Sequence, residues 1–229
     1  MNNTYDWLLF DADNTLLDFE ATQEFGLQEM FKDIGIPYQE SYMETYKVVN
    51  TAYWSAYEDG KIDKETLKVR RFGEFFQRLG VEVSPEECSK SYRKHIANTD
   101  FLLEGAIELL DLAKAHHRLA LVTNGLADVQ RPRLRKSGIY DYFEVIVVSD
   151  EIGLAKPDRA FFEYCFAEMQ TTKPHEHLMV GDNLKADIGG AQAFGMETCW
   201  MNVRRKANET AVKPTFEVQQ LKELQERLF

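Results

Sequence analysis

The chain has 229 residues, which suits one α/β domain that carries a smaller inserted domain. Its formal net charge of −11 repels polyanions, so we expect no polymeric nucleic acid as a partner, whereas a small phosphorylated substrate remains compatible. No apolar run reaches the roughly eighteen residues of a membrane span. The N-terminus has no basic region before a long apolar run, so we expect no signal peptide and a cytoplasmic location.

Short apolar runs predict buried parallel strands, because they are rich in Leu, Val, Ile and Met. They lie near residues 7–10, 119–123, 144–149, 178–181 and 197–201. Helical patterns separate most of them, at 105–115, at 128–136 with Gly138 as a C-cap, from Pro157-Asp158 onward with Pro157 in the first turn, and at about 187–194. Alternating strands and helices predict a Rossmann-like parallel sheet with helices on both faces.

The stretch 17–100 breaks this alternation, because it shows helical patterns and no convincing strand. Tyr46, Val49 and Tyr53 recur at helical spacing, as in the seam of a helical bundle. Ser84 and Pro85 fit the cap and the first residue of a later helix. We therefore expect an α/β catalytic core of residues 1–16 and 101–229, with a helical cap of residues 17–100 inserted after the first strand.

Polar groups end or closely follow four of the apolar runs. They are Asp11-Ala12-Asp13, Thr123-Asn124-Gly125, Lys156-Pro157, and Gly181-Asp182-Asn183 with Asp187 beyond. A lone pair of aspartates is a weak signal, since Asp commonly caps turns after strands. Four such groups in one order are a strong signal, because ligands bind at the carboxyl ends of open parallel sheets.

The residue types in these groups suit phosphoryl transfer. Asp11, Asp182 and Asp187 offer the hard oxygen ligands that Mg²⁺ prefers. Lys156 supplies a point charge for phosphate oxygens. Thr123 and the backbone N–H groups near Asn124 can donate to the same oxygens. Asp13, two residues beyond Asp11, can protonate a leaving oxygen and then activate water.

The four groups resemble the four motifs of the haloacid dehalogenase-like (HAD) hydrolase superfamily, and the resemblance covers almost the whole chain, including the inserted helical cap. It implies that Asp11 is a nucleophile and metal ligand. It also implies that Asp13 is the general acid and base and lends its backbone carbonyl to the metal. Dehalogenases of the superfamily lack an aspartate at this second position, so Asp13 favours phosphate chemistry through an aspartyl-phosphate.

The same resemblance implies roles for the later motifs. Thr123 and Lys156 hold the phosphoryl group, Asp182 ligates Mg²⁺, and Asp187 supports the metal from nearby. Many relatives have Gly where this chain has Asn14. Asn tolerates a positive φ better than most residues, so the replacement fits the same backbone requirement.

The segment around Asn50 and Trp54, with Tyr57 and Gly60 beyond, resembles the cap of the pyrimidine nucleoside 5′-monophosphatase branch of the superfamily. This implies a nucleoside monophosphate as the substrate, with uridine and thymidine monophosphates preferred. The amide of Asn50 can hydrogen-bond a pyrimidine edge, and the ring of Trp54 can stack on it. The alternative is that Trp54 and Tyr57 fill the interior of the bundle.

Other functions stay compatible with the sequence. The same aspartates serve a phosphatase for phosphoglycolate or a sugar phosphate, or a phosphomutase. A non-catalytic protein that binds phosphate ligands is a further alternative, although the reactive Asp11, Asp13 and Lys156 are all present.

Overall fold

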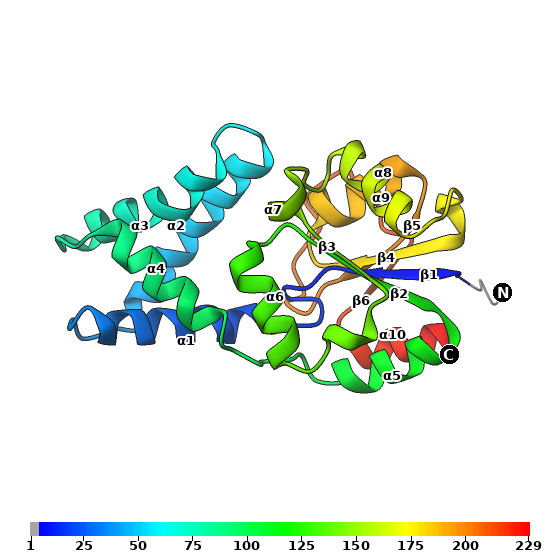
Figure 1. The fold of residues 1–229 in the computed structure, drawn as a ribbon, viewed down its shortest axis with the longest axis horizontal. Helices are drawn as coiled ribbons and strands as arrows, with labels where there is room; N and C mark the ends of the chain where they lie inside the picture. The colour runs from blue at the N-terminus through cyan, green and yellow to red at the C-terminus, as the bar shows by residue number, and fades with distance from the viewer. Residues whose placement is uncertain (1–4) are drawn as a thin grey trace. The chain divides into compact units, whose positions relative to one another are not determined.

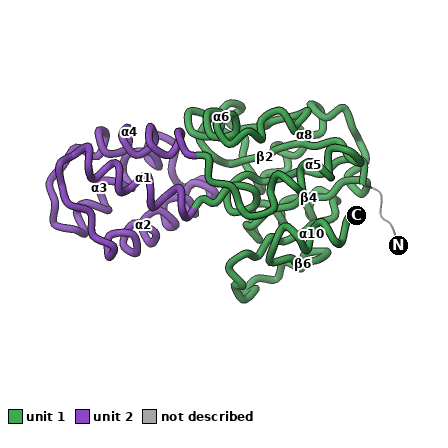
Figure 2. The backbone as a smooth tube through the Cα atoms, turned by 90° about the horizontal axis from the view of Figure 1, so that it is seen from below, with its two compact units in different colours: residues 1–19, 100–229 green, residues 20–99 purple. Residues whose placement is uncertain are grey.

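The computed structural model describes residues 5–229, and the chain divides into two compact units (Figure 2). The larger unit comprises Met1–Phe19 and Asp100–Phe229, and the smaller, helical unit comprises Glu20–Thr99. Within the part of the chain that is described, no helix is both long enough and apolar enough to cross a membrane.

A six-stranded sheet forms the centre of the larger unit (Figure 1). Its strands are β1 (Trp7–Phe10), β2 (Arg118–Thr123), β3 (Val145–Val148), β4 (His177–Gly181), β5 (Glu197–Met201) and β6 (Phe216–Val218). They run parallel in the order β3-β2-β1-β4-β5-β6, which confirms the predicted sheet. The sequence did not predict β6, because a three-residue strand shows too little of an apolar run.

Helices cover both faces of this sheet, as predicted. In Figure 1, α5 (Ala106–His116) and α10 (Leu221–Leu228) lie below it, and α8 (Arg159–Glu168) and α9 (Gly190–Phe194) lie above it. The strand residues alternate accordingly. Leu8 and Phe10 of β1 pack in the core with α5 and α10, whereas Trp7 and Leu9 pack in the core with α8.

Two predicted helix starts differ from the structure. Helix α8 begins at Arg159, after a cis Lys156–Pro157 bond, so the prediction that Pro157 lies in its first turn is wrong. The side chain of Asn124 binds both the N–H and the carbonyl of Lys156, each at 2.8 Å, and this keeps the segment outside the helix. The expected helix at 187–194 begins earlier, with a π-helical turn at Leu184–Gly189 before α9.

Further helical segments belong to the larger unit. They are α6 (Ala127–Lys136), α7 (Ser149–Ile152) and the 3₁₀ turns Tyr140–Tyr142 and Pro174–Glu176. Gly138 follows α6 in the left-handed region at φ 75°, which confirms its predicted place at the C-terminal end of that helix.

The smaller unit is a helical bundle of α1 (Phe19–Asp33, whose first residue falls in the larger unit), α2 (Ser41–Glu58), α3 (Lys64–Leu79) and α4 (Pro85–Ile96). Aromatic rings dominate its interior, namely Phe31, Tyr46, Phe72, Phe75, Phe76 and Tyr92. Tyr46 and Val49 are buried in the predicted seam, whereas Tyr53 is only half-buried. Ser84 accepts a hydrogen bond from the Glu87 N–H at 3.2 Å, which confirms the predicted cap of α4.

Candidate active site

The register of the sheet brings the predicted polar groups to one edge. Phe10 pairs with Leu121 of β2 and with Val180 of β4, so the residues that follow these positions leave the sheet side by side. The N–H of Asp11 still donates to the carbonyl of Val180 at 2.9 Å, which fixes the first residue after β1. Thr123 closes β2 at the same edge.

The ammonium group of Lys156 lies at the centre of this cluster. Its Nζ is buried and lies 2.7 Å from Asp11 Oδ1 and 2.7 Å from Asp187 Oδ1, and it donates to the carbonyl of Val122 at 2.6 Å. Burial alone lowers the pKa of Lys156, but Asp11 and Asp187 outweigh it and raise that pKa above its usual value. Lys156 is therefore a fixed positive charge beside Asp11.

Three carboxylates gather around this charge. Asp11, Asp182 and Asp187 each offer an oxygen, and these oxygens lie within 4.8 Å of one another. Burial raises the pKa of Asp11 well above its usual value against the opposing effect of Lys156, and the other two carboxylates raise it further. Burial, followed by Asp187 and Asp13, raises the pKa of Asp182 to about 7.

The raised pKa values of Asp11 and Asp182 mean that Lys156 alone does not offset the negative charge of the clustered carboxylates. A divalent cation with hard oxygen ligands fits both the donor atoms and the excess charge. The backbone supports this arrangement, because the Asn183 N–H donates to Asp187 Oδ2 at 3.0 Å. A Cβ at Gly181 would lie 2.5 Å from Cγ of Asp187, so only glycine leaves room for that carboxylate.

Asn14 meets the backbone requirement expected of it, with φ at 57°. Its side chain also makes contacts that glycine lacks. Asn14 Nδ2 donates to Asp182 Oδ2 at 3.3 Å, and Asn14 Oδ1 accepts from Arg204 at 3.3 Å. Asn14 therefore links Asp182 to a cationic side chain from beyond β5.

Asp13 is held by two residues of α6 that the sequence interpretation missed. Arg133 donates to Asp13 Oδ1 at 2.6 Å, and Gln130 Nε2 donates to Asp13 Oδ2 at 2.7 Å. The same Gln130 nitrogen lies 3.1 Å from Thr123 Oγ1. Their spacing from Val129 and Leu134 could have placed both on a buried face of the helix, but it does not identify Asp13 as their partner.

The two predicted base contacts lie on α2 of the helical unit. Asn50 is buried, and its Oδ1 accepts a hydrogen bond at 2.7 Å from the buried Arg71. Because arginine only donates, this contact turns the Asn50 amide nitrogen away from Arg71. Trp54 is half-buried and lies edge-to-face with Tyr57, with ring centroids 5.9 Å apart. Trp54 is therefore not enclosed in the aromatic interior of the bundle.

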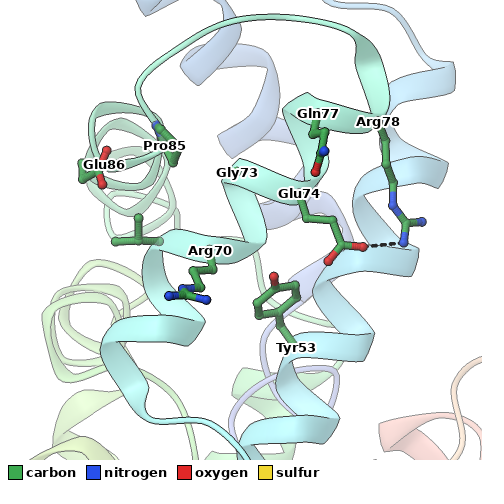
Figure 3. A pocket seen from close by; sticks show the side chains of 9 residues that line it. Tyr53, Arg70, Gly73, Glu74, Gln77, Arg78, Pro85 and Glu86 are labelled. Carbon is green, nitrogen blue, oxygen red and sulfur yellow. Dashed lines mark hydrogen bonds and ion pairs between the residues drawn. The ribbon is translucent and has the colours of Figure 1, made fainter.

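A hollow of about 530 Å³ lies within the helical unit, on α3 next to Tyr53 and the start of α4 (Figure 3). Its charges are mixed, since Arg70, Arg78, Glu74 and Glu86 all line it. Glu74 and Arg78 already form an ion pair. The hollow therefore has no excess positive charge with which to bind a phosphate.

Comparisons of the chain with a family model and with known proteins all point to the same family. The model of the haloacid dehalogenase-like hydrolase family matches residues 5–195. The chain is 36% identical to the HAD-hydrolase YfnB of Bacillus subtilis, over 96% of this chain and 94% of that protein. It is 34% identical to the pyrimidine 5′-nucleotidase YjjG of Escherichia coli, over 98% of each chain.

A solved structure shows the same fold over nearly the full length. The crystal structure of YfnB from Bacillus subtilis, bound to magnesium, superposes with a TM-score of 0.92 at 35% identity and covers 98% of each chain. The TM-score and the coverage show that the two chains share one fold over nearly their whole length.

Proposed function

Because the chain belongs to the haloacid dehalogenase-like hydrolase family, we propose that it is a Mg²⁺-dependent phosphomonoesterase that acts through Asp11. The observation that carries this proposal is the position of the Lys156 ammonium, 2.7 Å from both Asp11 and Asp187, beside three clustered carboxylates. The Lys156 ammonium attracts a phosphoryl group to Asp11. The three carboxylates suit a magnesium ion that would bind together with this group.

The proposed ligands of the magnesium ion are Asp11, Asp182 and the backbone carbonyl of Asp13, with Asp187 in support. When bound, the ion offsets charge on the phosphoryl oxygens and lets an anionic nucleophile approach an anionic ester. The raised pKa of Asp11 is consistent with this need, because it reflects burial and neighbouring negative charge that a bound cation would counter.

The proposed reaction has two steps. A carboxylate oxygen of Asp11 attacks phosphorus while the bond to the leaving oxygen breaks, and Asp13 gives its proton to that oxygen. Water then attacks the phosphorus of the aspartyl-phosphate, Asp13 takes a proton from the water, and the carboxylate of Asp11 is released with phosphate. Lys156 and Thr123 hold the phosphoryl oxygens in both steps, with the Asn124 segment beside them.

The proposed substrate is a nucleoside 5′-monophosphate with a pyrimidine base. The similarity to the pyrimidine 5′-nucleotidase YjjG over 98% of each chain supports this choice. In our proposal, Asn50 donates from its amide nitrogen to a base carbonyl, and Trp54 stacks on the ring. The contact of Asn50 Oδ1 with Arg71 supports this orientation of the amide.

A phosphate-release panel with Mg²⁺ tests the proposal. It should include uridine, thymidine, adenosine and guanosine 5′-monophosphates, phosphoglycolate and a hexose phosphate, with Asp11→Asn as the control for contaminating phosphatase. We expect the highest kcat/KM with the pyrimidine monophosphates. A preference for phosphoglycolate or hexose phosphate would reject the nucleotidase proposal, and no phosphate release from any ester would reject phosphatase activity.

A further inference from the structure

Both oxygens of the Asp13 carboxylate are held by side chains from α6. Arg133 contacts Oδ1 at 2.6 Å and Gln130 contacts Oδ2 at 2.7 Å. Both side chains are buried, and Arg133 has no exposed surface. The Arg133 guanidinium also lies over the ring of Phe19, 5.4 Å from its centroid, and this gives the guanidinium a second contact besides Asp13.

Burial of the Arg133 guanidinium costs folding free energy. A buried guanidinium loses its hydration, and the fold recovers this cost only if a carboxylate and further contacts are well placed. The residue that Arg133 and Gln130 hold is Asp13, which itself keeps 24% of its side-chain surface exposed. The rigid pair is therefore buried behind a carboxylate that remains accessible.

We propose that Gln130 and Arg133 are positioning residues that hold the Asp13 carboxylate in one orientation for proton transfer; this rests on the proposed phosphatase function. A carboxylate oxygen has two lone-pair sites, so one contact on each oxygen leaves a site for a substrate oxygen or a water. Proton transfer requires a heavy-atom separation near 2.6–3.2 Å, and a freely rotating carboxyl group would rarely provide it.

Gln130 also connects the proton-transfer group to the phosphate-binding group. Its Nε2 lies 2.7 Å from Asp13 and 3.1 Å from Thr123 Oγ1. Thr123 in turn accepts from the N–H of Gly125 at 3.1 Å. Gln130 thus sets the distance between the residue that holds the phosphoryl oxygens and the residue that protonates the leaving oxygen.

Gly125 provides the space that Gln130 occupies. A Cβ at position 125 would lie 2.6 Å from Cγ of Gln130 and 2.8 Å from its Cδ, closer than any ordinary contact. Gly125 has no positive φ, so the backbone conformation accepts alanine there and the nearest obstacle to its Cβ is the Gln130 side chain. Gly125→Ala therefore displaces the Gln130 amide without removing it.

Two esters with different leaving groups can show whether Gln130 and Arg133 position a proton donor or only stabilise the structure. Uridine 5′-monophosphate expels an alkoxide, which needs a proton, whereas p-nitrophenyl phosphate expels a stable nitrophenolate, which does not. The value of kcat/KM reports the steps up to formation of the aspartyl-phosphate, so it isolates the step in which Asp13 acts as an acid.

The test compares Gln130→Leu and Arg133→Lys on these two esters, with Mg²⁺ present. We expect kcat/KM to fall by about tenfold or more with the nucleotide and by less than about threefold with p-nitrophenyl phosphate, since general acid catalysis contributes roughly 10²–10⁴-fold. The matched control is Arg135→Lys on the same helix. Arg135 is exposed and stacks on Tyr140 at 4.6 Å, so its replacement should change neither value.

Equal losses on both esters would overturn the inference, because they would show a general effect on folding or binding. A wild-type protein that hydrolyses neither ester would instead overturn the proposed function, so the two failures are distinguishable. If Arg133→Lys does not fold, a double-mutant cycle decides. Introduced into the wild type, Gly125→Ala should lower kcat/KM for the nucleotide selectively. Introduced into Gln130→Ala, the same substitution should lower kcat/KM by less than about a further twofold, because the side chain that it displaces is already gone. Additive losses in the double variant would overturn the inference.

Discussion

The two units of the molecule use buried polar groups differently. In the larger unit, Asp11, Lys156 and Asp187 are buried at one edge of the sheet, and Lys156 contacts both carboxylates. In the helical unit, the buried contact between Arg71 and Asn50 lies in a mostly aromatic interior. The register of parallel strands fixes where strand-end residues meet, whereas an aromatic residue in a bundle serves packing and recognition equally well.

This difference separates reaction from substrate choice. Changes to Asp11 or Lys156 at the sheet edge should affect every phosphate ester alike, because these residues act on the phosphoryl group that all esters share. Changes in the helical unit should alter the ranking of substrates and leave the reaction itself in place.

The largest effect is expected for Asp11→Asn. Activity should fall by at least about 10⁴-fold on every phosphate ester, because an amide is a poor nucleophile. The fold should persist, since burial already raises the pKa of Asp11 and so disfavours its charged form. Phosphate release and thermal unfolding measure the two outcomes. Normal turnover in this variant would reject Asp11 as the nucleophile.

Lys156→Met should damage both activity and stability. Removal of the ammonium leaves Asp11 and Asp187 buried without their cation, which typically costs about 3–5 kcal/mol of the free energy of unfolding. Activity should fall by roughly 10²–10³-fold or more on all esters. Urea unfolding checks the stability loss. The control is Lys173→Met, an exposed lysine paired with Glu176, and an equal loss there would contradict the account.

Asp182→Asn should change the response to pH and to magnesium. The pKa of Asp182 is raised to about 7, so the metal-free folded protein retains a proton that the unfolded chain releases at lower pH. The free energy of unfolding should therefore fall as pH rises from about 4 to about 7 and stay low above that range. In Asp182→Asn, the free energy of unfolding should fall less with rising pH than in the wild type. Mg²⁺ should also raise the thermal stability of this variant less.

Thermal unfolding with and without Mg²⁺, at about pH 5.5 and about pH 8, measures both effects of this substitution. The exposed Asp141 supplies a control, because Asp141→Asn removes the same carboxylate outside the cluster. A wild-type response to Mg²⁺ in Asp182→Asn would exclude Asp182 as a ligand.

The smallest effect is expected for Trp54→Ala in the helical unit. Loss of a stacked base should lower kcat/KM for pyrimidine monophosphates by about tenfold, since stacking is worth roughly 1–3 kcal/mol per base. Hydrolysis of p-nitrophenyl phosphate should change little. The half-buried Tyr53 lies on the same helix, so Tyr53→Ala is the matched control. If the ratio of kcat/KM for the two substrates does not change, Trp54 serves only packing.

Most of the larger unit could be predicted from sequence because its strands are apolar and its polar groups follow them. The strand β6 and the helix α10 were missed, since three strand residues and eight helical residues near the C-terminus carry little periodicity. Asn14 was interpreted correctly, because a positive φ is a local property of the backbone. Local properties and strand ends are what a single sequence expresses most directly.

The partners of Asp13 could not be predicted in the same way. Gln130 and Arg133 lie 117 and 120 positions from it in the chain, and polar residues on a helix are normally assigned to its exposed face. Asn50 posed a similar problem, since its contact with Arg71 joins two different helices. Contacts of this kind depend on tertiary packing, which periodicity does not encode.

The central claim, that Asp11 accepts the phosphoryl group, is tested most directly by trapping that intermediate. Asp13→Asn should still react with p-nitrophenyl phosphate, whose leaving group needs no proton, but should hydrolyse the aspartyl-phosphate slowly because the base is absent. Acid quenching followed by peptide mass spectrometry should then find one phosphoryl group on Asp11, together with a burst of one nitrophenolate per site. Nitrophenolate release without a burst, with Asp11 unmodified throughout, would contradict the account.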